Sequence, residues 1–257
     1  MGKLKAVCVG INYPGTSAEL YGCVNDANDW EALLIDAGYE VVKLLDSDAT
    51  KVNIMTALQV AASSSKRGHR LVFTYSGHGT WKPDFDGDEI DGRDEALCPI
   101  DYAENRLIVD DELQEAFSLL PSGAGSLVIS DSCHSGTLSK NLLGSLAPGR
   151  PRYLSPSSFT DLTAKQVSRV EETIDTKSPR KSSSLISGCM DHEYSYDGVF
   201  DGRPNGAMSK AAFLTYRPGI RLNTWYKEIR EMLPSTDYPQ TPQLTSSNLY
   251  RRYSRAI

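Results

Sequence analysis

One cysteine and one histidine follow predicted strands at turns, where reactive side chains can be displayed. His78 lies between two glycines after the apolar segment Arg70–Ser76, and Cys133 follows Ser126–Ser130 about 55 positions later. Because the carboxyl ends of neighbouring parallel strands meet at one edge of a sheet, we expect the two side chains to face each other. An adjacent imidazole can activate a thiol that is mostly protonated at neutral pH, and can then protonate a leaving amine. The pair predicts nucleophilic catalysis by Cys133 with His78 as its base.

The backbone beside this pair could bind a developing oxyanion. The N–H groups of Gly79 and Cys133 are the predicted donors, and losing one such donor typically slows a reaction by ~10²–10³. Two plainer interpretations stay open: Cys133 as a small buried hydrophobic residue, and His78 as a turn residue. His134 is a rival base, but adjacent residues of an extended segment point to opposite sides, so we expect a structural role for it.

The elements that must position these residues alternate between strands and helices. Short β-rich segments predict strands at Lys5–Ile11, Glu40–Leu45, Arg70–Ser76, Ser126–Ser130 and Ser184–Ser187. Apolar residues at helical spacing predict helices at Asn25–Ala37, Lys51–Ala62, Asp111–Leu120, Ala207–Tyr216 and Asn223–Leu233. This alternation favours a mostly parallel sheet with helices on both faces, and a site beyond the carboxyl ends of its strands. Two polar segments, Lys82–Glu95 and Lys140–Ser183, resist regular structure in this interpretation.

Composition excludes several classes of protein. The net charge is −6 and no basic block with interleaved aromatics occurs, so we do not expect a nucleic acid partner. No apolar run approaches the ~20 residues of a membrane span, and no signal peptide precedes the first strand. Five widely spaced cysteines suit reduced thiols in the cytoplasm, without a disulfide framework or a zinc site. We therefore expect a cytoplasmic protein that does not bind membranes.

The sequence around the pair resembles the two signature motifs of metacaspases, which are relatives of caspases. These motifs are Tyr75-Ser76-Gly77-His78-Gly79 and Asp131-Ser132-Cys133-His134-Ser135-Gly136. Weaker similarities occur at Leu20–Ala27, Ser187–Cys189 and Pro239–Gln243, so the resemblance covers about residues 4 to 247. It implies a single peptidase domain over residues 1–257, with a three-layer caspase/haemoglobinase-like α/β fold. It also implies a Cys/His dyad and hydrolysis after basic P1 residues.

The resemblance further implies where the basic P1 side chain binds. Its S1 pocket would be built from Asp26 and Asp131, with Cys23 and Ser76 beside them. Paired carboxylates with little to neutralise them prefer a guanidinium or ammonium ligand, which supports this assignment independently. Alternatively, Asp26 serves the N-terminus of a helix and Asp131 orients the neighbouring loop. The partners implied are protein or peptide substrates with Arg or Lys at P1, bound by a monomer.

One residue of this chain argues against regulation by calcium, and the chemistry itself requires no cofactor. The family's calcium ligands match Asp94, Asp110 and Asp111, but Lys140 stands where a fourth Asp is expected, which should weaken a site for a hard cation. The acidic segment Lys82–Glu95 resembles an EF-hand loop, yet Glu89 replaces its required glycine and no helices are predicted to flank it. We interpret it as a solvated loop.

The basic, Ser- and Pro-rich segment 140–183 is a candidate processing loop. A protease specific for basic residues could cut it, by itself or in another molecule, and the alternative is a tolerated surface insertion. Its candidate P1 residues are Lys140, Arg150, Arg152, Lys165, Arg169, Lys177, Arg180 and Lys181.

Two other functions compete with proteolysis. One is a catalytically idle caspase-like scaffold that binds partners, and the other is a calcium-responsive regulatory protein. The presence of Cys133, His78 and both acidic residues argues against the scaffold, because a binding module does not need the whole set.

Overall fold

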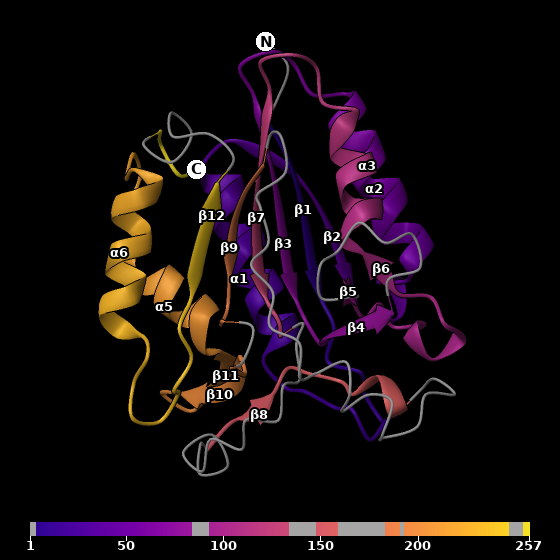
Figure 1. The fold of residues 1–257 in the computed structure, drawn as a ribbon. Helices are drawn as coiled ribbons and strands as arrows, with labels where there is room; N and C mark the ends of the chain where they lie inside the picture. Colours follow the sequence, from indigo (N-terminus) through magenta and orange to yellow (C-terminus); the bar gives the residue numbers. More distant parts are fainter. Residues whose placement is uncertain (1–3, 84–92, 134–147, 159–182, 191–192, 247–253) are drawn as a thin grey trace.

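The centre of the molecule is a six-stranded sheet with the strand order β12-β9-β7-β3-β1-β2 (Figure 1). The structure is a computed structural model, and it describes residues 4–83, 93–133, 148–158, 183–190, 193–246 and 254–257. The strands are β1 (Leu4–Gly10), β2 (Tyr39–Leu45), β3 (Arg70–Ser76), β7 (Gly125–Asp131), β9 (Ser183–Ser187) and β12 (Gln243–Ser246). Only β12 runs antiparallel to its neighbour, so the predicted mostly parallel sheet is confirmed.

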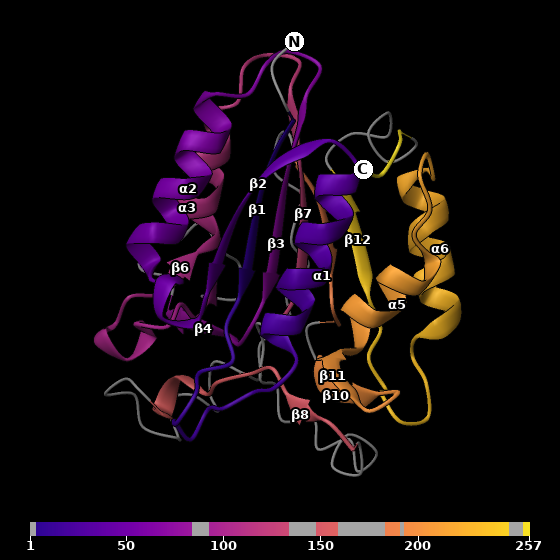
Figure 2. The same ribbon diagram turned by 180° about the vertical axis from the view of Figure 1, so that it is seen from behind.

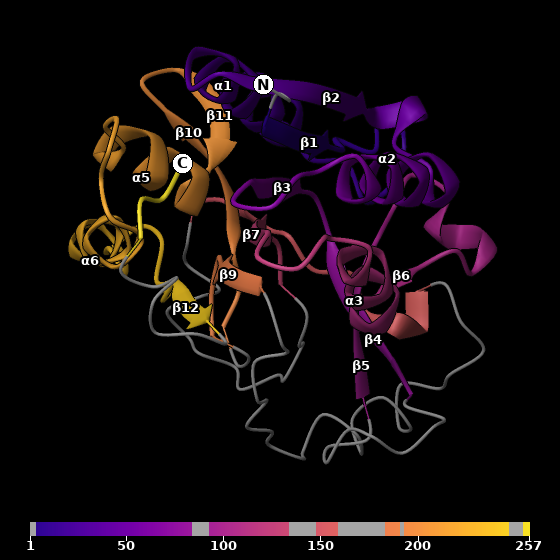
Figure 3. The same cartoon turned by 90° about the horizontal axis from the view of Figure 1, so that it is seen from above.

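Helices cover both faces of this sheet, which gives the predicted three-layer α/β arrangement (Figures 2 and 3). On one face lie α2 (Lys51–Ser63) and α3 (Asp110–Ser118), and on the other lie α1 (Cys23–Asp36), α5 (Ala207–Thr215) and α6 (Leu222–Met232). Each of the ten strands and helices predicted from periodicity has a counterpart within two residues of its expected ends.

Strand residues alternate between the two faces, and each face has its own apolar cluster. Val7 and Phe73 pack with the α2 and α3 residues, whereas Cys8 and Val72 pack with Trp30 and the α5–α6 residues. Burial on both faces explains why the central strands are almost uniformly apolar. The sheet is therefore a rigid support for whatever follows its strands.

Two small sheets gather where the parallel strands end (Figures 1 and 2). One contains β4 (Gly79–Pro83), β5 (Arg93–Leu97) and β6 (Ile108–Val109), and the other contains β8 (Arg150–Pro151), β10 (Tyr196–Phe200) and β11 (Arg203–Gly206). These strands show that the expectation of irregular structure was wrong at both ends of Lys82–Glu95 and at β8. Cross-strand pairing stabilises them, which their charged or Pro-containing sequences do not reveal.

Short 3-10 turns complete the described structure at Asp46–Asp48, Tyr102–Glu104 and Pro156–Ser158. Among the described residues, no helix is both long and apolar enough to cross a membrane.

Candidate active site

The two predicted catalytic residues lie side by side at the carboxyl edge of the sheet. β3 and β7 are parallel neighbours, and Ser76 at the end of one pairs with Asp131 at the end of the other. His78 and Cys133 each follow two residues after these paired positions, and both are buried. The expected juxtaposition of the two strand ends is what the structure has.

The ring of His78 is fixed by its neighbours. Its Nε2 lies 2.8 Å from the carbonyl oxygen of Ala18, so Nε2 carries the proton and Nδ1 is left as the acceptor. The ring packs against Tyr13 with 4.9 Å between centroids, and the Tyr13 hydroxyl accepts the His78 backbone N–H. Burial is the main cause that lowers the pKa of His78 to about 4, opposed by the hydrogen bond that the ring donates to the Ala18 carbonyl oxygen. The imidazole is therefore neutral near pH 7.

The sulfur of Cys133 contacts the backbone of Ser195. Its Sγ accepts the backbone N–H of Ser195 and lies 3.5 Å from the Ser195 carbonyl oxygen. A hydrogen bond with Cys133, followed by burial, raises the pKa of the Cys189 thiol. No hydrogen bond between the Cys133 thiol and His78 is present among the described residues. Another segment of the chain contacts the backbone next to both residues, at Gly79 and at Cys133.

Residues 150–154 run as an extended segment across this edge. Arg150 and Pro151 form β8, which pairs antiparallel with Asp197 and Tyr196 of β10. Further along, Leu154 donates its N–H to the Gly79 carbonyl oxygen at 3.0 Å. The segment is thus held by backbone pairing on both sides of Arg152.

The carbonyl group of Arg152 lies where the sequence predicts an oxyanion hole. Its oxygen accepts the N–H of Gly79 at 3.0 Å and the N–H of Cys133 at 3.2 Å. On the other side, the Arg152 N–H donates to the Ser195 carbonyl oxygen at 2.8 Å. These three hydrogen bonds fix one peptide unit at the backbone of Gly79 and Cys133, next to the two predicted catalytic residues.

The side chain of Arg152 is fully buried and surrounded by three carboxylates. Nη2 lies 2.7 Å from Asp26 Oδ2 and 2.9 Å from Asp197 Oδ1. Nη1 lies 3.3 Å from Asp131 Oδ2 and 3.1 Å from the Asp131 carbonyl oxygen. The two acidic residues predicted to recognise a basic side chain both contact one, and Asp197 is a third that the sequence analysis missed.

Backbone N–H groups at the start of α5 stabilise these buried carboxylates. Gly206 donates to both oxygens of Asp26 at 3.1 Å, and Ser209 donates to Asp131 Oδ2 at 2.8 Å. The N-terminal end of a helix carries partial positive charge, which favours anions there. Burial still dominates at Asp26 and raises its pKa to about 6, while the Arg152 guanidinium acts in the opposite direction.

The other predicted pocket residues lie close by. Cys23 is the first residue of α1 and is buried; its thiol pKa is raised by burial and lowered by the Arg152 guanidinium. Ser76, at the end of β3, is also buried, and its Oγ has no hydrogen-bond partner within the part of the chain that the structure describes.

The predicted calcium ligands lie in or directly after strands of the small sheet β4-β5-β6. Asp94 is in β5 beside Lys82, 3.6 Å from its ammonium, and Asp110 and Asp111 begin α3 directly after β6. Within the described ranges, no three His, Cys, Asp or Glu side chains form a group that could hold a metal ion. Calcium binding therefore stays a prediction.

The processing candidates divide into two sets. Arg152 is buried in the site, while the side chain of Arg150 donates to the Glu19 carbonyl oxygen at 2.7 Å and lies 4.8 Å over the Tyr21 ring. The other six candidates lie outside the described residues; they are Lys140, Lys165, Arg169, Lys177, Arg180 and Lys181. His134 and residues 84–92 of the acidic segment also lie outside the described residues.

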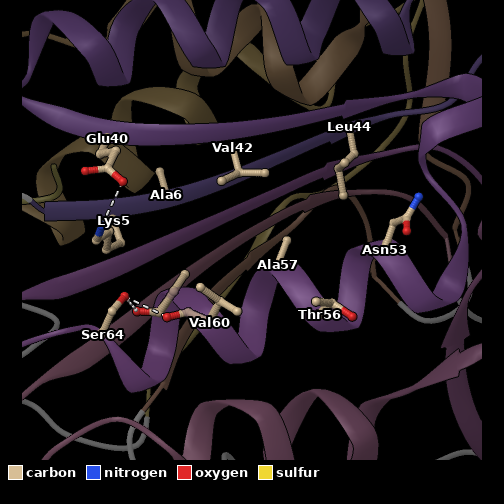
Figure 4. Close-up of a pocket in the computed structure, with 11 residues that line it drawn as sticks. Lys5, Ala6, Glu40, Val42, Leu44, Asn53, Thr56, Ala57, Val60 and Ser64 are labelled. Atoms are coloured by element: carbon tan, nitrogen blue, oxygen red, sulfur yellow. Dashed lines mark hydrogen bonds and ion pairs between the residues drawn. The ribbon is translucent and has the colours of Figure 1, made fainter.

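A separate groove of about 320 Å³ lies between α2 and strands β1 and β2 (Figure 4). Val42, Leu44, Ala57 and Val60 line it, together with the paired Lys5 and Glu40. None of its lining residues belongs to the predicted site, so it has no part in the chemistry considered above.

Residues 4–141, more than half of the chain, match the family model of the metacaspase peptidase C14 domain. The chain belongs to the metacaspase family. A Metacaspase-1 of Cryptococcus neoformans var. neoformans serotype D is 36% identical over 96% of the chain, which spans 63% of that relative's length. A Metacaspase-1 of Mycosarcoma maydis is 33% identical over 96% of the chain, which spans 71% of that protein.

Solved structures agree on the fold. Protein GSU0716 from Geobacter sulfurreducens has a TM-score of 0.75 and 28% identity, with 99% of this chain and 98% of that chain covered. Caspase-1 from Spodoptera frugiperda has a TM-score of 0.58 at 13% identity, covering 95% of this chain and 85% of that one. The second similarity concerns the fold alone, and it confirms the expected caspase-like architecture.

Proposed function

We propose that the chain is a cysteine endopeptidase that hydrolyses peptide bonds after Arg or Lys. The observation that carries this proposal is the placement of Arg152, whose side chain lies among Asp26, Asp131 and Asp197. Its carbonyl oxygen meanwhile receives two N–H groups beside Cys133. A basic P1 residue of a substrate would bind in the same way, with its scissile carbonyl group already polarised.

The same contacts suggest the course of the reaction. The Cys133 sulfur attacks the carbonyl carbon after its proton passes to Nδ1 of His78, and the new S–C bond pushes the C=O electrons onto an oxygen held by Gly79 and Cys133. The tetrahedral intermediate collapses, the C–N bond breaks, and the imidazolium protonates the leaving amine. Water then gives a proton to His78 and attacks the acyl carbon, the C–S bond breaks to release the acid, and the imidazolium returns the proton to the sulfur.

The direct test is turnover of fluorogenic peptides that differ only at P1. Arg and Lys peptides should be cleaved, whereas an Asp peptide should not, because the carboxylates of the pocket repel an anion. Cys133→Ala should abolish the turnover. Cleavage after Asp, or equal turnover by the Cys133→Ala variant, would overturn the proposal.

Arg152–Tyr153 is the bond that we propose as the site of processing within segment 140–183. The Arg152 side chain lies among the pocket's carboxylates, and the Arg152 carbonyl oxygen accepts the N–H groups of Gly79 and Cys133. Until this bond is cut, residues 150–154 keep other peptides out of the site. The chain would then be both the first substrate and its own competitive inhibitor.

Intact-mass measurements during incubation test this step. The wild-type chain should yield two fragments, one beginning at Tyr153, while Cys133→Ala and Arg152→Gln should keep this bond. Arg152→Gln should also turn over the Arg peptide without a lag, because the segment 150–154 loses the charged contacts that hold it in the site and can be displaced without being cut. Identical masses for wild type and Cys133→Ala would contradict self-processing and leave the peptide assay to decide the proteolytic function.

A scaffold function is the second candidate, and the occupied site favours it. A site contacted by the chain's own segment 150–154 suits a protein that does not admit substrates. The Arg152→Gln variant separates the two: a scaffold stays inactive towards every peptide when the pocket is vacated, whereas a latent protease becomes active.

Calcium would act on this enzyme from outside the pocket, through Asp94, Asp110 and Asp111. All three lie near the β5–β6 pairing, and β5 is joined to β4, whose first residue Gly79 contacts the Arg152 carbonyl group. Peptide turnover with millimolar calcium, compared with turnover in a chelator, tests this regulation in the wild type and in Asp94→Asn.

A further inference from the structure

The chain that follows Arg152 pairs with β4, a strand to which the sequence analysis assigned no function beyond Gly79. Gly79 forms a parallel bridge with Tyr153. Its N–H donates to the Arg152 carbonyl oxygen at 3.0 Å, and its carbonyl oxygen accepts the Leu154 N–H at 3.0 Å. One glycine thus binds the peptide backbone on both sides of the bond Arg152–Tyr153, and the backbone beyond that bond is held in register with β4.

Thr80, the next residue of β4, contacts the same backbone with its side chain. It is fully buried, and its Oγ1 donates to the Leu154 carbonyl oxygen at 2.7 Å. Pairing of Thr80 with Ala96 of β5 fixes the strand that carries this hydroxyl. The acceptor is a backbone carbonyl group, which every residue has, so any extended peptide that replaces this segment can accept the same hydrogen bond.

The side chain of Leu154 adds an apolar contact to these backbone contacts. It is partly buried and packs against the apolar cluster that the sheet shares with α2 and α3. Displacement of residues 150–154 from the site would expose that part of the cluster to water. An apolar side chain of an incoming peptide would cover it again, whereas it is costly to bury a polar side chain against apolar atoms.

We propose that β4 and this part of the apolar cluster form a subsite for the second residue after the cleaved bond, P2′, and that the subsite takes an apolar side chain. This inference rests on the proposed proteolytic function. Gly79 binds the P2′ N–H, Thr80 binds the P2′ carbonyl group, and the cluster selects the side chain. The substrates are then protein segments with a basic residue before the cleaved bond and an apolar residue two positions after it.

The first test compares internally quenched peptides that copy residues 149–156 and differ only at the position of Leu154. One peptide keeps Leu, and the other carries Asn, which is nearly the same size but polar. The enzyme is the full-length chain with Arg152→Gln, whose own segment can be displaced. The kcat/KM of the Leu peptide should be higher by roughly 10-fold or more.

Three outcomes of this comparison decide between the proposals. Equal kcat/KM for the Leu and Asn peptides would refute the apolar subsite while leaving the protease in place. Cleavage of a short coumarin amide with Arg at P1, but of neither long peptide, would refute the subsite as well. Failure to cleave the short and the long substrates alike would refute the proposed function instead.

Thr80→Val, added to the same chain, tests the hydroxyl, because valine keeps the shape of threonine but cannot donate. The short coumarin amide has no P2′ carbonyl group, so the ratio of kcat/KM for the long Leu peptide to that for the short amide should fall by roughly 3- to 10-fold. Thr80→Ser keeps the hydroxyl and should keep the ratio. Thr56→Val, at an exposed position of α2, is the matched control and should also keep it.

The ratio of long to short substrate is independent of the fraction of active enzyme, so partial misfolding does not mimic the effect. An unchanged ratio in Thr80→Val would refute the role of Thr80. If Thr80→Val does not fold at all, the comparison of Leu and Asn peptides still decides the subsite, because it needs no change at Thr80.

Discussion

The two halves of the site that Arg152 occupies are built in different ways. The half around His78 and Cys133, called the neutral half, uses an imidazole that burial keeps neutral near pH 7 and backbone N–H donors from the ends of two adjacent strands. The half around the Arg152 guanidinium uses buried charges from α1, β7 and β10. Chemistry at any peptide bond needs only the first half, whereas the choice of residue needs the second. Rate and specificity should therefore respond to different substitutions.

The largest expected effect is in the neutral half. His78→Ala removes the proposed general base, so kcat should fall by roughly 10²–10⁴ for Arg and Lys peptides alike. Steady-state kinetics with both peptides measures this, and the ratio between them should not change. A loss confined to one peptide would mean that His78 belongs to recognition and that the division between the halves is wrong.

Gly206→Ala should affect the charged half alone. A Cβ at this position would lie 2.1 Å from Asp131 Oδ2 and 2.4 Å from Arg152 Nη1, although the φ of −71° suits alanine. Crowding of this kind typically costs about 1–3 kcal/mol, so kcat/KM for the Arg peptide should fall roughly 5- to 150-fold. Lys210→Ala on the same helix is the control, and equal kinetics for both variants would contradict a pocket at Gly206.

The acidic pocket should also set the pH dependence. The pKa of Asp26 is raised to about 6, so its ionised form is lost below that pH, whereas His78, with a pKa lowered to about 4, stays neutral there. A P1 cation binds the ionised carboxylate, so kcat/KM should rise with pH through about 6 and then level off. Asp26→Asn should flatten this rise. The same rise in both proteins would assign it to another group.

The smallest expected effect concerns the orientation of His78. Tyr13→Phe removes the hydroxyl that accepts the His78 N–H at 3.0 Å, but keeps the ring that packs against the imidazole. An unsatisfied buried N–H typically costs about 1–3 kcal/mol of stability. Thermal unfolding should show that loss, and the Arg-to-Lys ratio should stay unchanged. Unchanged stability would show that this hydroxyl does not support the site.

Local pattern was enough to predict the central fold and the neutral half of the site. Apolar periodicity located the strands, and the position of His78 and Cys133 just beyond them followed from the rule for parallel sheets. The predicted start of α1, Asn25, differs by only two residues from the observed start at Cys23. The apolar residues of the packed face recur at helical spacing along the whole helix, so they mark where it begins and ends.

The charged half could not be predicted in the same way. Asp197 lies 171 positions after Asp26, and no spacing or periodicity indicates that the two share one nitrogen of Arg152. Arg152 itself was one of eight basic candidates in a polar segment, indistinguishable by composition. The pairing of β8 with β10 places Arg152 in the site, and that pairing depends on contacts between segments distant in the chain.

Covalent labelling tests the central claim, that an acidic pocket presents a basic P1 residue to Cys133, most directly. The Arg152→Gln chain would be treated with two peptidyl chloromethyl ketones that differ only in Arg or Asp at P1, and the labelled residue would be identified by peptide mass mapping. The account predicts that the Arg reagent modifies Cys133 and that the Asp reagent does not. Equal labelling by both reagents, or labelling of another cysteine by the Arg reagent, would contradict it.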